Sequence, residues 1–267
     1  MKHLMLVLVA LTLAACSPTS STTDVNAPAA DSIVGGEKVA RLSAVGKSTV
    51  GLYEKDIGYI CSGTLVGKNL ILTAAHCVDP KSKNLIAVFE TEIKKAKKDK
   101  LRKITHWAVH PSYSEEMKAK DLGDIAILRF EGSLPIGYEV APILFDAQAV
   151  QRSKRTIVAG YGLNWATLIS RGAGVLRTTK LDIDDPIYSN TEALLGQSVR
   201  RGICSGDSGG PAYFEIGGRL HVWGVASRGD SLPLFFVPKC MLFSIFTRVD
   251  AYQDWITSTM ASLEVIR

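Results

Sequence analysis

Ser208 lies in a short run of residues whose types suit nucleophilic chemistry. Residues 204–211 read CSGDSGGP, so glycines flank an acid and a serine, and a proline closes the run. This composition predicts a tight turn rather than a helix or a strand. Glycines let backbone N–H groups crowd together and point at one spot, which is how main chain can bind an oxyanion. Because a serine hydroxyl is a poor nucleophile by itself, the turn needs a base from elsewhere in the chain.

His76 and Asp124 are the candidates for that base and for the acid that supports it. His76 belongs to TAAHC at residues 73–77, and Asp124 belongs to DLGDIAIL at residues 121–128. Asp124 stands directly before an apolar run that predicts a buried strand, where a carboxylate can fix the tautomer of an imidazole and stabilise its charged form. Asp121 is the competing carboxylate. The other histidines, interpreted as surface or core residues, are His3, His106, His110 and His221.

The order histidine, aspartate, serine is that of chymotrypsin, and it differs from the orders in subtilisin and the α/β-hydrolases. A further motif, IVGG at residues 33–36, precedes all three, and YQDWI follows them at residues 252–256. With these motifs in this order, the chain resembles the trypsin/chymotrypsin-like serine proteases from residue 33 to residue 256.

The resemblance implies a catalytic triad of His76, Asp124 and Ser208. It favours Asp124 over Asp121, because the Asp-Ile-Ala context of the family belongs to Asp124. It also implies an oxyanion hole formed by the backbone N–H groups of Gly206 and Ser208. The implied reaction is hydrolysis of peptide bonds, which makes the chain a serine endopeptidase.

The elements that must position these residues read as strands. Alternating apolar and polar residues, with a glycine turn, predict strands at residues 49–53, 59–66 and 70–73. The resemblance implies a strand at 156–162 that opens the second barrel, its hairpin partner at 172–181, and a strand at 220–227 after the nucleophile turn. Many short strands favour an all-β fold. The resemblance implies two six-stranded antiparallel β-barrels, one over about 33–146 and one over about 147–249, with a linker at 135–151 and the catalytic cleft between the barrels.

The protease domain, residues 33–267, is expected to end in a helix. From residue 250 the apolar residues recur at helical spacing, which predicts an α-helix over about 250–263 with Asp250 as its N-cap.

The resemblance pairs four of the five cysteines. Cys61 with Cys77 would fix the histidine loop, and Cys204 with Cys240 would join the nucleophile turn to the far wall of the specificity pocket. Cys16 remains for a lipid. This use of cysteine is typical of export to an oxidising compartment.

Ile33 and Asp207 form the activation pair that the resemblance implies. In this family a cut frees the α-amino group of the first residue, which inserts and pairs with the acid before the nucleophile. A buried carboxylate needs such a partner to hold the oxyanion turn. Ser32 stands where trypsin-activated relatives carry Arg or Lys, so another protease or self-cleavage must make the cut. The alternative is that IVGG is only a first strand with a glycine turn.

The specificity pocket implied by the resemblance is uncharged. It comprises Gly202 at the base, Ile203 beside it, Gly229 on the open wall and Ser244 at the back. A buried cationic substrate side chain would be unpaired there, at a cost of several kcal/mol, so we expect cleavage after apolar residues, of undecided size. Arg228 replaces the aromatic residue usual on the substrate-binding strand, and apolar residues 232–237 lie in an insertion before Cys240.

Composition excludes several other classes of function. The 267 residues are 46% apolar and 21% charged, and the net charge of +5 is mild. No basic stripe interleaved with aromatics indicates a nucleic-acid partner, and no apolar run reaches the roughly 18 residues of a membrane span. Seven Lys/Arg residues at 92–103 favour a solvated face over a partner-binding patch. No metal or organic cofactor is implied, and the calcium loop of some relatives has no clear carboxylate pattern here.

The N-terminal 32 residues are interpreted as a targeting signal followed by a flexible tether. A charged start and an apolar run indicate a signal peptide over residues 1–15, and LAACS resembles the bacterial lipoprotein box, with Cys16 lipidated. The alternative is ordinary cleavage that leaves Cys16 a free thiol. Residues 16–32, rich in Ser, Thr, Ala and Pro, predict a flexible tether and propeptide. By resemblance to Gram-negative lipoproteins, Ser17 next to the lipid implies the outer membrane.

We therefore expect an exported bacterial serine endopeptidase, anchored in the outer membrane or periplasmic. Its partners would be protein or peptide substrates and an activating protease, with membrane contact only through the lipid at Cys16. It would act as a monomer, and a cut before Ile33 would release the domain from its anchor, even to the outside of the cell. The alternatives are a non-catalytic envelope binding protein with this fold and an esterase that uses the same triad.

Overall fold

The computed structural model describes residues 33–79, 81–82, 84–116, 119–163, 165–166, 170–198, 201–229, 240 and 242–266. The signal peptide, Cys16, the tether and the insertion at 232–237 lie outside the described residues, so those expectations stay predictions.

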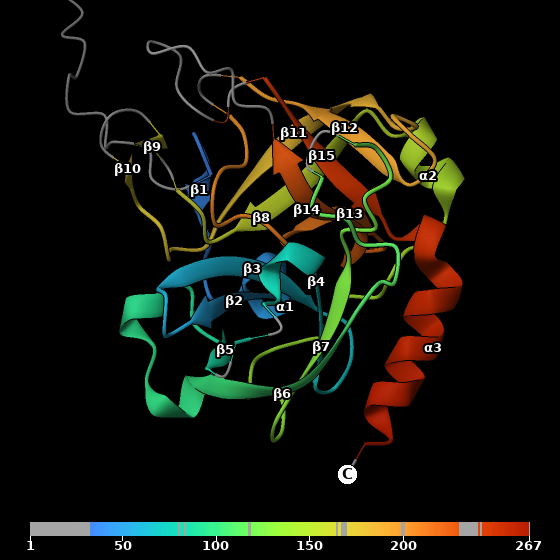
Figure 1. Cartoon of the computed structure of the whole chain (residues 1–267). Coiled ribbons are helices and arrows are strands. Elements are labelled where there is room, and N and C mark those ends of the chain that lie inside the picture. The colour runs from blue at the N-terminus through green and yellow to red at the C-terminus, as the bar shows by residue number, and fades with distance from the viewer. Residues whose placement is uncertain are drawn as a thin grey trace, which may run out of the picture.

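Six antiparallel strands form the first barrel, the lower one in Figure 1. In barrel order they are β2 (Thr49–Glu54), β3 (Tyr59–Leu65), β4 (Leu70–Thr73), β7 (Ala126–Phe130), β6 (Leu101–Val109) and β5 (Leu85–Val88), which pairs again with β2. Strand β7 is buried along nearly its whole length, because one face points into the barrel and the C-terminal helix covers the other.

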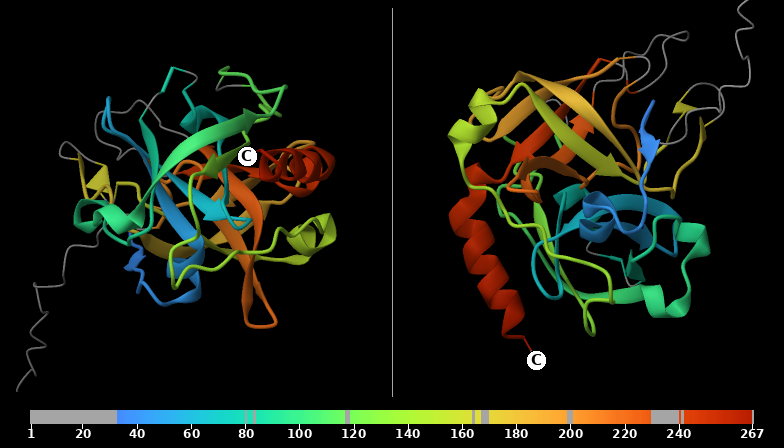
Figure 2. Two further views of the ribbon diagram at one scale, coloured as in Figure 1. Left: turned by 90° about the horizontal axis from the view of Figure 1, so that it is seen from below. Right: turned by 180° about the vertical axis from the view of Figure 1, so that it is seen from behind.

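The second barrel is closed by β8, which pairs with both β11 and β13. Its strands in order are β8 (Arg155–Gly160), β11 (Arg177–Asp185), β12 (Glu192–Gly196), β15 (Phe243–Arg248), β14 (Arg219–Gly229) and β13 (Pro211–Ile216). The short N-terminal strand β1 (Glu37–Lys38) pairs with β11, so the start of the protease domain lies on the second barrel (Figure 2). Strands β9 (Trp165–Ala166) and β10 (Ser170–Arg171) form a separate hairpin.

Among the described residues, three α-helices accompany the barrels: α1 (Ala44–Ser48), α2 (Ala147–Arg152) and α3 (Gln253–Glu264). Short 3₁₀ turns occur at Ala75–Cys77, Ile93–Lys95, Lys98–Lys100 and Asp250–Tyr252. Helix α3 leaves the second barrel and packs along β4, β6 and β7 of the first, so it spans both halves (Figures 1 and 2). No helix in these described ranges is long and apolar enough to cross a membrane.

The interior of the second barrel is filled around Trp223 and Phe246, and Ile33 is buried in the same cluster. The Trp223 ring stacks on Phe214, and its indole N–H donates to Thr156 Oγ1 at 2.8 Å, so the one polar atom of the ring is satisfied. Burial of Ile33 places the start of the protease domain within the barrel that carries the Ser208 turn.

These observations confirm the predicted all-β class, the two six-stranded barrels and the C-terminal helix. Two details differ. The linker contains α2, whose first turn is capped by the Asp146 carboxylate through Gln148 N–H and Ala149 N–H. Asp250 does not cap α3; its carboxylate accepts from Arg248 Nε at 3.1 Å and Nη2 at 2.5 Å instead, because the guanidinium lies only two residues away.

Candidate active site

His76 is held to Asp124 by two hydrogen bonds. The His76 ring Nδ1 lies 2.8 Å from Asp124 Oδ2, and the His76 backbone N–H donates to Asp124 Oδ1 over 3.0 Å. His76 sits in the 3₁₀ turn after β4, and Asp124 precedes β7, the strand that pairs with β4. Pairing of these two strands is therefore what brings the two residues together. Because the carboxylate only accepts, Nδ1 carries the proton of this hydrogen bond, and Nε2 is left as the basic nitrogen of the ring.

Asp124 is only 1% exposed, and three donors compensate its burial. Besides the two from His76, the hydroxyl of Ser227 donates to Oδ2 at 2.6 Å. Burial alone would raise the pKa of Asp124, but the hydrogen bond and charge of His76 and the hydrogen bond of Ser227 outweigh it, and the pKa is lowered. Asp124 is thus an ionised carboxylate at neutral pH.

The turn that carries Ser208 needs glycine on either side of it. Gly206 has φ +97° and Gly209 has φ +76°, values that favour glycine. A Cβ on Gly209 would also collide with Thr73 Oγ1 and the Ser62 carbonyl. This close approach packs the Ser208 turn against the residues that lead into the His76 turn.

Ser62 of β3 links the same turn to the first barrel. Its backbone N–H donates to the Ser208 carbonyl at 2.8 Å, and its hydroxyl donates to the Gly206 carbonyl at 2.9 Å. The Ser62 hydroxyl accepts in turn from the Tyr161 N–H at 2.9 Å. The nucleophile turn of one barrel is therefore fixed to a central strand of the other.

Two backbone donors of this turn are unengaged. Within the described part of the chain, the N–H groups of Gly206 and Ser208 donate no hydrogen bond, whereas those of Asp207, Gly209 and Gly210 do. No hydrogen bond joins the Ser208 hydroxyl to the His76 ring among these same residues, and such contacts commonly tighten only when substrate binds. Two free donors beside a half-buried serine suit an oxyanion.

Asp207 is fully buried beside them and accepts only backbone donors. Gly162 N–H reaches Oδ1 and Cys204 N–H reaches Oδ2, each at 2.8 Å. No cation of the described residues pairs with it. Burial raises the pKa of Asp207 to about 7, although the two backbone hydrogen bonds act in the opposite direction. Val34 forms a β-bridge with Gly202, two residues before Cys204, so the start of the protease domain lies near this carboxyl.

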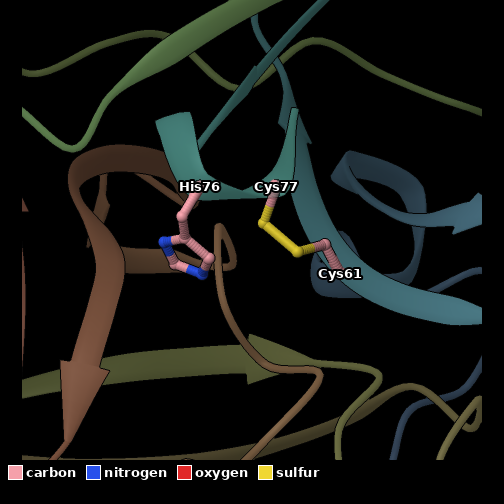
Figure 3. A group of neighbouring side chains, drawn as sticks. All are labelled: Cys61, His76 and Cys77. Carbon is pink, nitrogen blue, oxygen red and sulfur yellow. A yellow bond between two sulfur atoms is a disulfide. The ribbon is translucent and has the colours of Figure 1, made fainter. Parts of the chain in front are cut away.

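Both disulfides form, Cys61 with Cys77 and Cys204 with Cys240. Figure 3 shows the first bridge next to His76, which shares its turn with Cys77. The ligand-type atoms of these three residues lie within 4.8 Å of one another. The two sulfurs are bonded to each other, so neither is a thiolate, and the cluster does not offer the ligand set of a metal site.

The candidate pocket residues meet around a side chain that sequence reasoning missed, Gln197. Its Oε1 accepts from the Ile203 N–H and lies 2.5 Å from where a Cβ of Gly202 would be, and its Nε2 donates to the Phe243 carbonyl at 3.1 Å. Gly229 pairs with Ser244 across β14 and β15. The Ser244 hydroxyl is buried and has no partner among the described residues.

Arg228 and Glu192 form a buried ion pair that sequence reasoning also missed. Arg228 Nη1 and Nη2 lie 2.7 and 3.0 Å from the two oxygens of Glu192, whose side chain is 1% exposed. Asp121, the competing carboxylate, accepts from the backbone N–H and hydroxyl of Thr191, both at 2.8 Å, and not from His76. No local pattern marks Gln197, Glu192 or Ser227, since each acts on a residue distant in the chain.

The remaining described histidines have structural surroundings. The His110 ring packs edge-on against Tyr252 and Trp255 of the C-terminal segment, and burial lowers its pKa. His106 contacts the hydroxyl of Thr105, and His221 contacts the Arg219 carbonyl. His3 lies outside the described residues.

A buried Asp–His pair beside a glycine-framed serine, at the junction of two antiparallel barrels, defines the class of serine hydrolases with a two-barrel fold. Comparison with known proteins is more specific. The family model of trypsin matches residues 33–256. The chain therefore belongs to the trypsin family, and it is a serine endopeptidase.

Three individual relatives are similar to the chain at modest sequence identity. Chymotrypsin-like elastase family member 1 of Felis catus is 29% identical over 76% of this chain and 80% of its own length. Coagulation factor IX of Cavia porcellus is 28% identical over 73% of this chain and 71% of its own. Chymotrypsin-like elastase family member 1 of Canis lupus familiaris is 26% identical over 76% of this chain and 82% of its own.

Proposed function

We propose that this endopeptidase hydrolyses peptide bonds with Ser208 as nucleophile, His76 as general base and Asp124 as its support. The observation that carries the proposal is the 2.8 Å bond from His76 Nδ1 to the buried Asp124, next to a turn with two unengaged N–H groups. That bond fixes the ring tautomer, so Nε2 is left to take the Ser208 proton.

The reaction follows from these positions. Ser208 Oγ attacks the scissile carbonyl carbon while His76 Nε2 takes its proton, and the oxyanion accepts from Gly206 N–H and Ser208 N–H. The C–N bond breaks as His76 gives that proton to the leaving amine. Water then attacks the acyl-enzyme, with His76 again taking the proton and returning it to Ser208. No cofactor takes part in this sequence.

Activation by a cut before Ile33 is the second part of the proposal. In the intact chain Asp207 is buried without a cation among the described residues, and its pKa of about 7 reflects that. A new α-ammonium group at Ile33 would supply the missing charge and hold the oxyanion turn. Burial of Ile33 and the Val34–Gly202 bridge support this role. Because Ser32 precedes the bond, the activating protease is one that does not require Arg or Lys.

For specificity we propose cleavage after apolar residues. The residues assigned to the pocket, Gly202, Ile203, Gly229 and Ser244, carry no charge. The carboxamide of Gln197 has both ends engaged by backbone groups, so it stiffens the pocket without offering a charge. A substrate Arg or Lys would be desolvated there without a counter-ion.

For location we propose export through the signal at residues 1–15 and lipidation of Cys16, which anchors a monomeric enzyme to the bacterial envelope until the cut before Ile33 releases it. Incorporation of a labelled fatty acid, lost in Cys16→Ala, tests the anchor. Recovery of the Ile33-started form in the membrane fraction after a high-salt wash would contradict release.

The central experiment uses the full chain with residues 28–32 replaced by Asp-Asp-Asp-Asp-Lys, so that enteropeptidase generates the Ile33 terminus. The cleaved protein is incubated with a complex peptide mixture, and the cut sites are identified by mass spectrometry. Cuts after apolar residues are expected in the cleaved protein and not in its Ser208→Ala variant. Cuts confined to Arg and Lys would overturn the specificity, and hydrolysis of esters without peptides would favour an esterase.

A non-catalytic binding protein is the remaining alternative. A fluorophosphonate labels an activated serine, so labelling of Ser208 in the cleaved protein is expected. A folded, cleaved protein that takes no label and cuts nothing would favour the binding protein.

A further inference from the structure

We propose that the buried Arg228–Glu192 pair positions Asp124 for catalysis and that it acts through the Ser227 hydroxyl. The inference rests on the proposed function, since it concerns the carboxylate that supports His76. Arg228 and Glu192 touch neither His76 nor Ser208, so we describe them as positioning residues.

The hydrogen-bond roles at Ser227 are fixed by chemistry. A guanidinium carries only donors, so the Ser227 hydroxyl can only accept from Arg228 Nη1, which lies 3.5 Å away. The single proton of that hydroxyl goes to Asp124 Oδ2, 2.6 Å away, because an ionised carboxylate only accepts. The Arg228 N–H that faces the hydroxyl oxygen polarises the hydroxyl and so strengthens its hydrogen bond to Asp124. The two contacts complete a buried chain of polar groups from Glu192 through Arg228 and Ser227 to Asp124. Polar chains of this kind are stronger when every member is satisfied.

Arg228 is itself held rigidly. Both oxygens of Glu192 accept from its guanidinium, and Nη2 also donates to the Ala119 carbonyl at 2.9 Å. The fork geometry of a guanidinium allows these contacts at once, which a lysine ammonium does not. Arg228 is 8% exposed, so water hardly competes for these hydrogen bonds.

The same pair contacts the segment that carries Asp124. Arg228 binds Ala119 on one side of Asp121, and Glu192 Oε1 accepts from the Leu122 N–H at 3.4 Å on the other side. Asp121 lies between them at φ +57° and is bonded to Thr191, the neighbour of Glu192. Because Asp121 is bonded to Thr191 independently of the pair, the stretch from residue 119 to Asp124 stays attached to the start of β12 when the pair is replaced, and the effect of the pair on Asp124 passes through Ser227.

A β-bulge in β14 makes the arrangement possible. Ala226 pairs with Phe246 and Arg228 pairs with Ile245, so Ser227 is an extra residue without a partner on β15. In a regular strand consecutive side chains point to opposite faces, whereas a bulge re-aims them. Here Ser227 and Arg228 are both buried, and both reach the Asp124 side.

The competing explanation is that the ion pair only fills space. Buried ion pairs can often be replaced by apolar residues of similar volume without loss of stability. The two explanations differ in the reaction, because an apolar pair would fill the volume but would not donate to the Ser227 hydroxyl and so would not strengthen its hydrogen bond to Asp124.

The test measures kcat and KM of the enteropeptidase-cleaved full chain on one peptide-amide substrate. For Arg228→Met/Glu192→Leu we expect kcat to fall about tenfold, as for loss of one well-placed hydrogen bond, with KM unchanged. The kcat of Ser227→Ala should fall by the same factor. The kcat of the triple variant, which combines Arg228→Met, Glu192→Leu and Ser227→Ala, should fall no further than that of Ser227→Ala. Arg228→Lys, which keeps Glu192 paired and so preserves the fold, should also lower kcat without changing KM.

The matched control is Arg248→Met/Asp250→Leu, which removes another nearly buried pair that does not contact Ser227 or Asp124. It should leave kcat unchanged. Wild-type kcat in both Arg228 variants, a rise in KM alone, or an additive fall in the triple variant would each overturn the inference. Activity that is absent in wild type, or that survives Ser208→Ala, would instead refute the proposed function.

Discussion

Two buried carboxylates belong to the candidate active site, and their surroundings differ. Asp124 is 1% exposed, accepts from the His76 ring, the His76 backbone and Ser227, and has a lowered pKa despite its burial. Asp207 is fully buried, accepts only from two backbone N–H groups, and has a pKa raised to about 7 by burial. The first site is complete in the intact chain, whereas the second lacks a counter-charge among the described residues.

The difference separates two roles for buried acids. An ionised acid that is already satisfied can act on its neighbours from the moment the chain folds. An acid whose pKa is raised by burial without a counter-charge titrates close to neutral pH, so a new cation beside it strongly favours its ionised form. On the proposed function, the Asp124 site supplies catalysis and the Asp207 site supplies control.

The largest expected effect is that of Asp124→Asn in the cleaved enzyme. A carboxamide offers one acceptor oxygen where three donors converge, so the His76 tautomer is no longer fixed. We expect kcat to fall about 10⁴-fold, the size seen when this acid is replaced in the chymotrypsin-type triad. A kinetic assay of the purified variant checks this. A fall smaller than that of Asp207→Asn would reverse the proposed division of roles.

The next effect concerns stability and pH in the intact chain. The folded-state pKa of Asp207, about 7, lies above its ordinary value of 3.8, so the folded chain binds more protons than the unfolded chain between these values. The stability contribution is therefore complete below pH 4 and is lost as pH rises through 7. At 1.36 kcal/mol per pH unit, 7 − 3.8 = 3.2 corresponds to about 4 kcal/mol.

Urea unfolding of the intact Ser208→Ala chain at pH 5 and pH 8 measures this slope, with autolysis prevented. The control is Asp207→Asn in the same background. It has no carboxyl group to titrate at this position, so its free energy of unfolding should not show this decline between pH 5 and pH 8. Cleavage before Ile33 should also abolish the decline, because the α-ammonium group favours the carboxylate. A decline that persists in Asp207→Asn would assign it to other groups.

Asp207→Asn in the cleaved enzyme should have a smaller effect than Asp124→Asn. Without a carboxylate the Ile33 α-amino group has no partner, so the Gly206 and Ser208 donors are less well held. We expect kcat/KM to fall about 10²-fold, comparable to loss of an oxyanion-hole donor. The same variant should leave the intact chain as stable as its parent at pH 5. Unchanged activity after cleavage would refute the activation pair.

Sequence predicted the parts of this comparison that depend on local pattern. The strands around His76 follow from alternation between glycine turns, and the resemblance supplied the triad and both barrels. It could not supply Ser227, Gln197 or the Arg228–Glu192 pair, because the bonds from Ser227 to Asp124, from Gln197 to Phe243 and within the pair join residues far apart in the chain whose local sequence is unremarkable. Asp250 was wrong as an N-cap because a guanidinium two residues away competes for the same carboxylate. Helix α2 was missed because six residues carry too little periodicity.

The smallest expected effect is that of Ser62→Ala, and it tests whether the nucleophile turn depends on Asp207 alone. The Ser62 hydroxyl joins the Gly206 carbonyl to the Tyr161 N–H, so its removal leaves both groups without that partner. We expect a loss of about 1–2 kcal/mol of stability and a few-fold fall in kcat/KM.

Ser62 acts from the first barrel and needs no α-ammonium group, so this stability loss should be equal in the intact and cleaved chains, as urea unfolding would measure. Asp207→Asn should instead cost stability mainly after cleavage. If Ser62→Ala destabilised only the cleaved chain, the contact between barrels would form upon activation, and the turn would be organised by Asp207 rather than held in advance by β3.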